Sequence, residues 1–209
     1  MSVYNGGVSG YSSGQELIKL IRDILSLRPD MIIVYDGFNE LGIDVQHPFA
    51  FAYARKIVDF AAKHMEMDRS GGDERAVALG VWSERDFFSN WLFNIRNMYA
   101  LSVSNNIKFY CFCQPELSTK KGKTIHERNM LLSAPCDYAL KRKKEGFRSY
   151  IKKVCELPDY IHDLSHIFDG EADIYMDSCH VWEKGNRIIA KEIMNVILPE
   201  MKKREDRNK

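Results

Sequence analysis

The chain has 209 residues, of which 45% are hydrophobic and 28% are charged, a composition typical of a globular protein. This length suits one core, so we predict a single domain over residues 1–209. Lys and Arg number 30 against 29 acidic residues, and the resulting net charge of +1 gives no reason to expect nucleic acid as a partner.

Cysteine usage and hydropathy limit the cellular setting. The five cysteines match no zinc-binding spacing, so we predict no metal site and no cofactor. Free, buried thiols favour a reducing compartment. We find no apolar run long enough to span a membrane and no signal peptide in residues 1–15. We therefore expect a cytoplasmic protein without a membrane span, and no pattern predicts its oligomeric state.

The first 35 residues predict a strand, a helix and a second strand. Residues 2–4 are β-prone and lead into a Gly/Ser-rich turn, and residues 15–27 carry apolar side chains at helical spacing. Pro29 ends that helix, because proline disfavours helix at the residue before it. Residues 31–35 are an unbroken apolar run, which is typical of a fully buried parallel strand.

The rest of the chain continues this alternation. Helices are predicted over residues 48–64, 84–103, 125–132, 138–155 and 184–202, and strands over residues 107–113 and 174–176. The fold class is therefore α/β, a three-layer α/β/α arrangement with a mostly parallel sheet and a helical insertion at about residues 41–105. The aromatic stretch 87–99 is interpreted as core. The basic runs 120–123 and 141–144, and the tail from Lys202, are interpreted as solvated faces.

Ligands bind beyond the carboxyl ends of the strands in open parallel sheets. Four segments follow the predicted strands at that edge, residues 5–13, 36–40, 114–117 and 177–180. Candidate functional residues are therefore sought in these segments.

Three of these segments carry motifs in a fixed order. Residues 5–12 read Asn-Gly-Gly-Val-Ser-Gly-Tyr-Ser, residues 37–40 read Gly-Phe-Asn-Glu and residues 177–180 read Asp-Ser-Cys-His. They resemble the second, third and last motif blocks of the SGNH/GDSL family of serine esterases, with Glu40 in place of the usual aspartate. Residues 113–117 and 163–170 extend the resemblance over nearly the whole chain. It implies a flavodoxin-like SGNH hydrolase fold.

The resemblance also assigns roles to four residues. His180 would be the general base, Asp177 would orient it, and the Gly10 amide and the Asn39 side chain would be oxyanion donors. Acyl transfer needs this set of groups, because a base must activate the nucleophile and donors must stabilise the developing oxyanion. The implied activity is hydrolysis of ester bonds, with a carbohydrate ester or a small acyl ester as substrate.

The Gly-Asp-Ser block that carries the family's nucleophile is missing from the sequence. In the family it lies upstream, after the first strand, and a helix and a second strand separate it from the block that contains Gly10. We therefore expect the chain to be N-terminally truncated and inactive alone, and a leader could be lost together with that segment. The alternative is a non-catalytic SGNH-like module that binds an acylated glycan or a protein partner.

A second alternative is an α/β-hydrolase that uses Ser12. Residues 10–14 match the Gly-x-Ser-x-Gly nucleophile elbow, but a polar stretch separates them from the preceding strand. The other role for Ser12 is to cap a helix. His162 and His166 have no zinc motif around them and are interpreted as structural or exposed, and Cys179 is interpreted as a space-filler.

Overall fold

The computed structural model describes residues 2–42, 87–132 and 157–207. The predicted helices 48–64 and 138–155 lie outside these ranges, as does the basic run 141–144. Most of the predicted insertion 41–105 also lies outside them, and the single-domain boundary stays a prediction. Within the described ranges, no helix is long and apolar enough to cross a membrane.

The centre of the fold is a parallel sheet with the strand order β1-β2-β3. Its strands are β1 (Met31–Asp36), β2 (Lys108–Cys113) and β3 (Ile161–Asp163). Asp36 lies opposite Cys113, and Cys113 lies opposite Asp163. All three strands therefore finish together, and the loops that follow them meet at one edge. The predicted strands 31–35 and 107–113 are confirmed.

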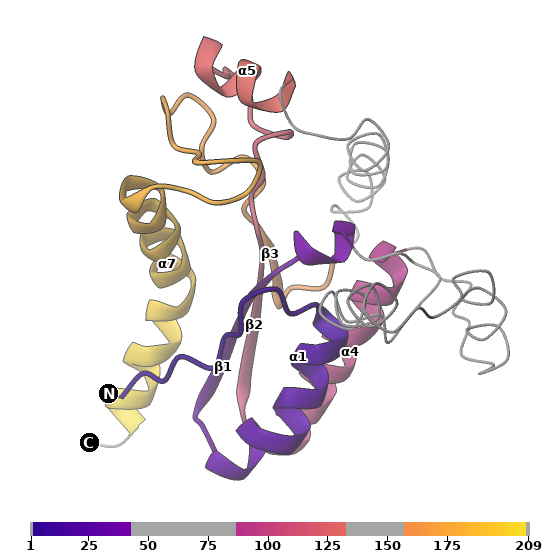
Figure 1. The fold of residues 1–209 in the computed structure, drawn as a ribbon. Helices are drawn as coiled ribbons and strands as arrows, with labels where there is room; N and C mark the ends of the chain where they lie inside the picture. The colour runs from indigo at the N-terminus through magenta and orange to yellow at the C-terminus, as the bar shows by residue number, and fades with distance from the viewer. Residues whose placement is uncertain (1, 43–86, 133–156, 208–209) are drawn as a thin grey trace, which may run out of the picture.

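Helices cover both faces of this sheet (Figure 1). On one face lie α1 (Ser13–Lys19) and α4 (Phe87–Ser104), and on the other lies α7 (Glu183–Arg207). A π-helical turn over Leu20–Ile24 and a 3-10 turn over Leu25–Leu27 continue α1, so residues 15–27 are helical as predicted. The short helix α5 (Ile125–Leu132) lies beyond the strand ends. The three-layer α/β/α prediction is confirmed.

Two apolar clusters, one on each face, form the core. The first joins α1, α4 and the sheet through Leu20, Phe88, Trp91, Ile95, Met98, Phe109, Cys111, Cys113 and Ile161. The second joins α7 and the 164–175 segment to the sheet through Phe112, Leu117, Leu164, Phe168, Ile174, Tyr175, Ile189 and Ile197. The interpretation of the 87–99 stretch as core is confirmed for four of its large side chains. Gly185 lets α7 pack closely against the segment that precedes it, since a Cβ there would lie 2.7 Å from the Cβ of Val181.

Three strand predictions need correction. Strand β1 is not fully buried, because Ile33 and Tyr35 on its second face are 43% and 37% exposed. Residues 2–4 form no strand, and Val3 and Tyr4 are more than 80% exposed. The segment 174–176 contributes an isolated antiparallel bridge between Tyr175 and Val181, not a sheet strand. The last two errors share a cause: a β-prone run becomes a sheet strand only when a partner backbone pairs with it.

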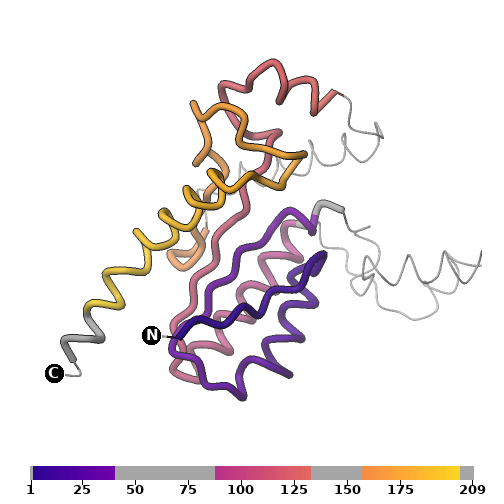
Figure 2. The backbone as a smooth tube through the Cα atoms, turned by 60° about the vertical axis from the view of Figure 1, so that its left-hand side comes forward, coloured from indigo at the N-terminus to yellow at the C-terminus, as the bar shows by residue number. Residues whose placement is uncertain are grey.

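The N-terminal stretch sets where the first motif block lies. Residues 2–12 run from the end of the molecule where the strands begin to the end where they finish, and α1 starts there (Figure 2). Gly10, in a turn closed by a hydrogen bond from Tyr11 N–H to Val8 O, has a φ of 79°, a left-handed conformation that favours glycine. The first block therefore reaches the carboxyl edge of the sheet.

A buried ion pair fixes the segment between β2 and α5. Lys120 Nζ lies 2.6 Å and 2.5 Å from the two carboxylate oxygens of Glu127, and both side chains have no exposed surface. Glu127 also accepts from Thr124 N–H, and Thr124 Oγ1 accepts from Glu127 N–H, which makes a capping box at the start of α5. The interpretation of residues 120–123 as a solvated face is therefore wrong for Lys120, because a buried carboxylate neutralises it.

Candidate functional site

Asp177 and His180 lie in a tight loop that directly precedes α7. Two backbone hydrogen bonds close this loop, from Met176 N–H to His180 O at 2.8 Å and from Trp182 N–H to Ile174 O at 2.9 Å. Oδ1 of Asp177 accepts from the N–H groups of Cys179 and His180 at 2.8 Å and 2.7 Å. The carboxylate is thus held by the backbone of its own loop, which leaves Oδ2 to reach the imidazole.

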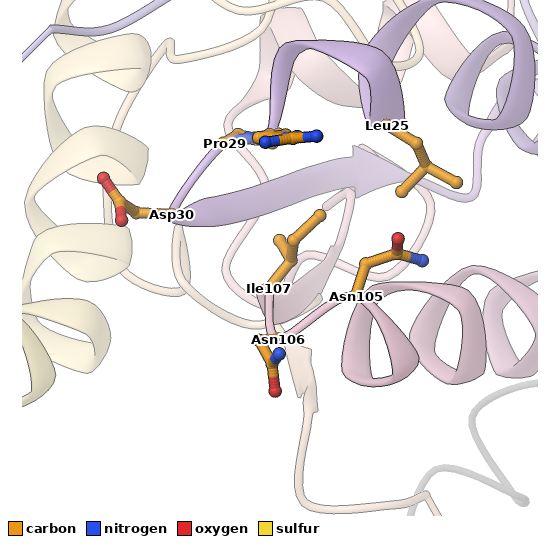
Figure 3. A pocket seen from close by; sticks show the side chains of 7 residues that line it. Leu25, Pro29, Asp30, Asn105, Asn106 and Ile107 are labelled. Atoms are coloured by element: carbon orange, nitrogen blue, oxygen red, sulfur yellow. The ribbon is translucent and has the colours of Figure 1, made fainter.

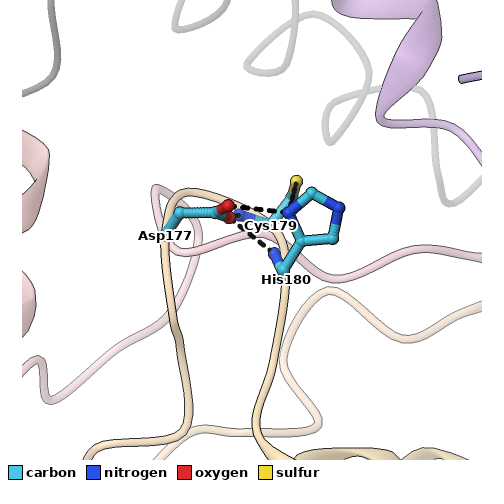
Figure 4. A group of neighbouring side chains, drawn as sticks. All are labelled: Asp177, Cys179 and His180. Atoms are coloured by element: carbon cyan, nitrogen blue, oxygen red, sulfur yellow. Dashed lines mark hydrogen bonds and ion pairs between the residues drawn. The ribbon is translucent and has the colours of Figure 1, made fainter.

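The imidazole of His180 is oriented by that second oxygen. Nδ1 of His180 lies 2.7 Å from Oδ2 of Asp177, and the other ring nitrogen points away from the carboxylate (Figure 4). Burial acts to raise the pKa of Asp177, but the two backbone N–H groups and the imidazole outweigh it and hold the pKa at about 2. An ionised carboxylate only accepts, so Nδ1 carries the proton and Nε2 is left as the basic nitrogen. This is the arrangement that a general base requires.

A pocket of about 410 Å³ lies beside this pair. Besides Asp177 and His180, its lining side chains are Tyr35, Gln114, Met176, Cys179, Val181 and Asn186. Tyr35 is near the end of β1 and Gln114 directly follows β2, so the pocket lies at the carboxyl edge that the sequence predicts. Asn186 and Tyr35 were not predicted, because no motif marks them and only the fold brings them to the loop.

Gly10 and Asn39 form a second group. Nδ2 of Asn39 donates to the Tyr11 carbonyl oxygen at 2.7 Å, which ties the segment after β1 to the residue after Gly10. A side-chain amide nitrogen carries two hydrogens, so this bond uses one of its donors. Neither residue is in the lining of the His180 pocket. Within the described ranges, the structure thus brings the candidate residues together as two pairs.

The segment that follows β2 connects the two pairs by backbone hydrogen bonds. Gln114 N–H donates to the Asp36 carbonyl oxygen at 2.9 Å, and a Cβ at Gly37 would lie 4.0 Å from Gln114 N. On the other side, Leu117 N–H donates to the Ser178 carbonyl oxygen at 2.9 Å, which fastens the 114–117 segment to the Asp177 loop. The segment after β2 therefore lies between the Asn39 turn and the His180 loop.

A buried polar network that was not predicted supports the Asn39 turn. Oε1 of Glu40 accepts from Ser13 N–H at 2.5 Å, and Asn94 donates to Ser13 Oγ at 2.9 Å. Trp91 Nε1 donates to Asp36 at 3.1 Å. The network joins β1, α1, α4 and the turn Asn39–Gly42. In the sequence, the only indication of this network was Glu40, which stands in place of the usual aspartate of the third motif block.

Burial shifts the protonation of these carboxyl groups. Burial and the nearby Asp36 raise the pKa of Glu40 to about 8, although the hydrogen bonds from Ser13 act to lower it. Burial likewise raises the pKa of Asp36 to about 6, against the hydrogen bonds from Gly37 and Trp91. The pKa of Glu16, on the first turn of α1, is also raised, by burial first and then by Asp36 and Glu40. Glu40 is therefore mostly neutral near pH 7.

This raised pKa predicts a fold that loses stability as the pH rises. Below pH 4.5, the ordinary pKa of Glu40, both the folded and the unfolded chain hold its proton. Between pH 4.5 and about 8 the folded chain holds it more tightly, so the free energy of unfolding should fall by up to about 1.4 kcal/mol per pH unit. Glu40→Gln keeps an acceptor for Ser13 and should flatten this slope in urea unfolding. Glu183→Gln, at a side chain 79% exposed, is the control, and an equal effect of the two substitutions would contradict the assignment.

Ser12 is part of a helix cap. It precedes α1, and its N–H donates to Gln15 Oε1 at 3.1 Å, half of the capping box that the two residues form. Ser12 is 8% exposed. Ser12 therefore caps α1, which is the structural role considered for it from the sequence.

Two further histidines give a useful comparison. Nδ1 of His166 lies 3.3 Å from Oδ2 of Asp169, the same residue spacing as in the Asp177–His180 pair but in reverse order. His162 stacks on Phe112 with ring centroids 4.9 Å apart. His166 is therefore a matched control for His180.

The opposite edge of the sheet holds a smaller pocket of about 220 Å³ (Figure 3). Residues 28–30 and 105–107, which precede β1 and β2, line it together with Leu25. None of the four candidate residues lies there. This pocket therefore lies apart from the four candidate residues, at the other edge of the described sheet.

Comparisons with known proteins give matches among solved structures alone. No protein-family model and no curated protein matches the sequence. The structure is similar to that of a GDSL-like lipase from Bacteroides thetaiotaomicron, with a TM-score of 0.49, 14% identity, and coverage of 93% of this chain and 74% of that one. It is also similar to an acetyl xylan esterase, with a TM-score of 0.46, 14% identity, and coverage of 92% and 79%.

Proposed function

We propose that this chain carries the acid–base pair and the oxyanion donors of an SGNH-type serine hydrolase that acts on ester bonds. The observation that carries the proposal is the Asp177–His180 pair, with Nδ1 bound to a carboxylate that the backbone holds and Nε2 directed away from it. The order of the three motif blocks supports the same assignment.

In the proposed mechanism, Nε2 of His180 removes the proton of a nucleophilic serine and later returns it to the leaving alcohol. Asp177 stays ionised and stabilises the imidazolium formed between the two steps. The Gly10 N–H and the Asn39 amide would donate to the oxyanion. Neither residue lines the His180 pocket, which lies on the other side of Gln114, so the two turns that carry them would have to move toward it. Each such donor is worth about 2.7–4 kcal/mol of barrier.

The serine itself is proposed to come from outside residues 1–209, as the missing Gly-Asp-Ser block implies. Ser12 is a poor candidate, because it is buried and engaged at the start of α1. A pocket of about 410 Å³ falls within the range of small-molecule sites, which supports a small acyl ester or an acylated sugar as substrate.

The test is hydrolysis of 4-nitrophenyl acetate and of acetylated sugars by the full-length protein, meaning the product of the whole reading frame that contains these 209 residues. Saturable turnover of either ester is expected. A folded full-length protein that binds acetylated sugar without turnover would instead support the non-catalytic module.

Ser12→Ala separates this proposal from an α/β-hydrolase mechanism. Removing the cap should lower the free energy of unfolding by about 1 kcal/mol. It should leave kcat for ester hydrolysis unchanged, because Ser12 would not touch substrate. Urea unfolding and steady-state kinetics on the same preparation measure both effects, and loss of turnover in a folded variant would favour Ser12 as the nucleophile.

A further inference from the structure

The loop of the candidate site also contains a thiol next to the imidazole. Sγ of Cys179 lies 3.6 Å from Nδ1 of His180, and Cys179 is 5% exposed while lining the same pocket. The ligand atoms of Asp177, Cys179 and His180 all lie within 4.8 Å of one another. Figure 4 shows the sulfur, the carboxylate and the ring nitrogen gathered at one side of the loop.

We propose that Asp177, Cys179 and His180 form a site for a single zinc ion, bound through a carboxylate oxygen, the thiolate and Nδ1. A tetrahedral ion with bonds of about 2.3 Å to sulfur and about 2.0 Å to nitrogen holds those two atoms roughly 3.5 Å apart, close to the observed 3.6 Å. The contact from Nδ1 to Oδ2, now 2.7 Å, would open by about half an ångström. The carboxylate and the sulfur, whose ligand atoms lie within 4.8 Å of each other, would have to come to roughly 3.5 Å on such an ion.

The hydrogen bonds around the ligands and the balance of charge both favour this ligand set. Oδ1 of Asp177 is held by two backbone N–H groups, and such anchoring of the non-ligating atoms is typical of metal sites. Zinc binding would release the thiol proton to solvent and move the imidazole proton from Nδ1 to Nε2. One carboxylate and one thiolate then balance the double positive charge. Sulfur and imidazole ligands select zinc over magnesium or calcium.

Three protein ligands leave a fourth position open for water or substrate. Because the three ligands line the pocket of about 410 Å³, that position would be reached from it. The zinc-bound state and the Asp177–His180 hydrogen bond exclude each other, since both use Nδ1. The site would therefore switch the loop between a metal-bound form and the acid–base pair of the proposed hydrolase.

The test measures thiol protection, so it does not depend on any ester activity. The 209-residue chain, freed of metal, is treated with iodoacetamide with and without added zinc, and each cysteine peptide is quantified by mass spectrometry. Zinc should slow alkylation of Cys179 at least tenfold, magnesium should not, and titration calorimetry should give one zinc per chain. The buried Cys111 and Cys113 serve as internal references.

Variants then identify the ligands. Cys179→Ser and His180→Ala should each weaken zinc binding at least tenfold, whereas His166→Ala, at the second His–Asp pair, should not. Unchanged alkylation of Cys179 under saturating zinc would overturn the inference, and so would equal zinc affinity in the Cys179→Ser variant. Either result would leave the proposed hydrolase untouched. Conversely, a full-length protein without esterase activity would leave the zinc site standing.

Discussion

Asp177→Asn should lower kcat for ester hydrolysis by the full-length protein about 10⁴-fold with little change in the loop. The asparagine oxygen can still accept from the N–H groups of Cys179 and His180, which hold the carboxylate now. Its amide nitrogen would replace Oδ2 and present a donor to Nδ1. The imidazole would then carry its proton on Nε2, where the base must be unprotonated.

The control for this substitution is Asp169→Asn, at the pair that Asp169 forms with His166. Asp169 is three residues from its histidine, as Asp177 is, but it does not line the His180 pocket. The kcat of Asp169→Asn should therefore stay within about threefold of that of the unsubstituted protein. Steady-state kinetics with 4-nitrophenyl acetate gives both values. Equal effects of the two substitutions would show that Asp177 has no special role.

Lys120→Met should lower the free energy of unfolding by about 3–5 kcal/mol. The substitution leaves the buried Glu127 carboxylate without its ion-pair partner, and Glu127 is held in place because it also caps α5 through Thr124. Burying an unpaired charge is among the most costly single changes in a protein. The measurement is urea unfolding followed by circular dichroism.

Two controls isolate the buried charge as the cause. Lys121→Met removes the neighbouring lysine, which is 76% exposed and lies 4.0 Å from Asp169, and should cost less than about 1 kcal/mol. Adding Glu127→Gln to Lys120→Met removes both charges and keeps an acceptor for Thr124 N–H, so most of the loss should be recovered. A double variant as unstable as the single one would contradict this account.

Local patterns were enough to predict most of the described fold. Helix α5 begins and ends at the predicted residues. Strand β2 differs from its prediction by one residue, because its apolar run is almost unbroken. Strand β3 was missed because Ile161-His162-Asp163 has no apolar pattern. It pairs with Cys111–Cys113 through backbone groups, and such pairing between distant segments leaves no trace in a three-residue run.

The candidate site was predictable to the same degree. The four-residue motif predicted that Asp177 and His180 lie together, because two residues three apart in one loop have side chains within hydrogen-bonding reach. The contact of Asn39 with Tyr11 and the burial of Glu40 were not predictable, because both depend on how the turn after β1 lies against α1. Cys179 was interpreted as a space-filler, and the structure adds its contact with the imidazole.

The central claim is that His180 is the general base of an ester hydrolase, and one comparison tests it most directly. The initial rate of 4-nitrophenyl acetate hydrolysis by the full-length protein is measured beside its His180→Ala and His166→Ala variants, each confirmed to be folded. We expect His180→Ala to lower the rate at least 10³-fold and His166→Ala to leave it within about threefold. Equal rates for the parent protein and His180→Ala would contradict the assignment of this loop as the catalytic site.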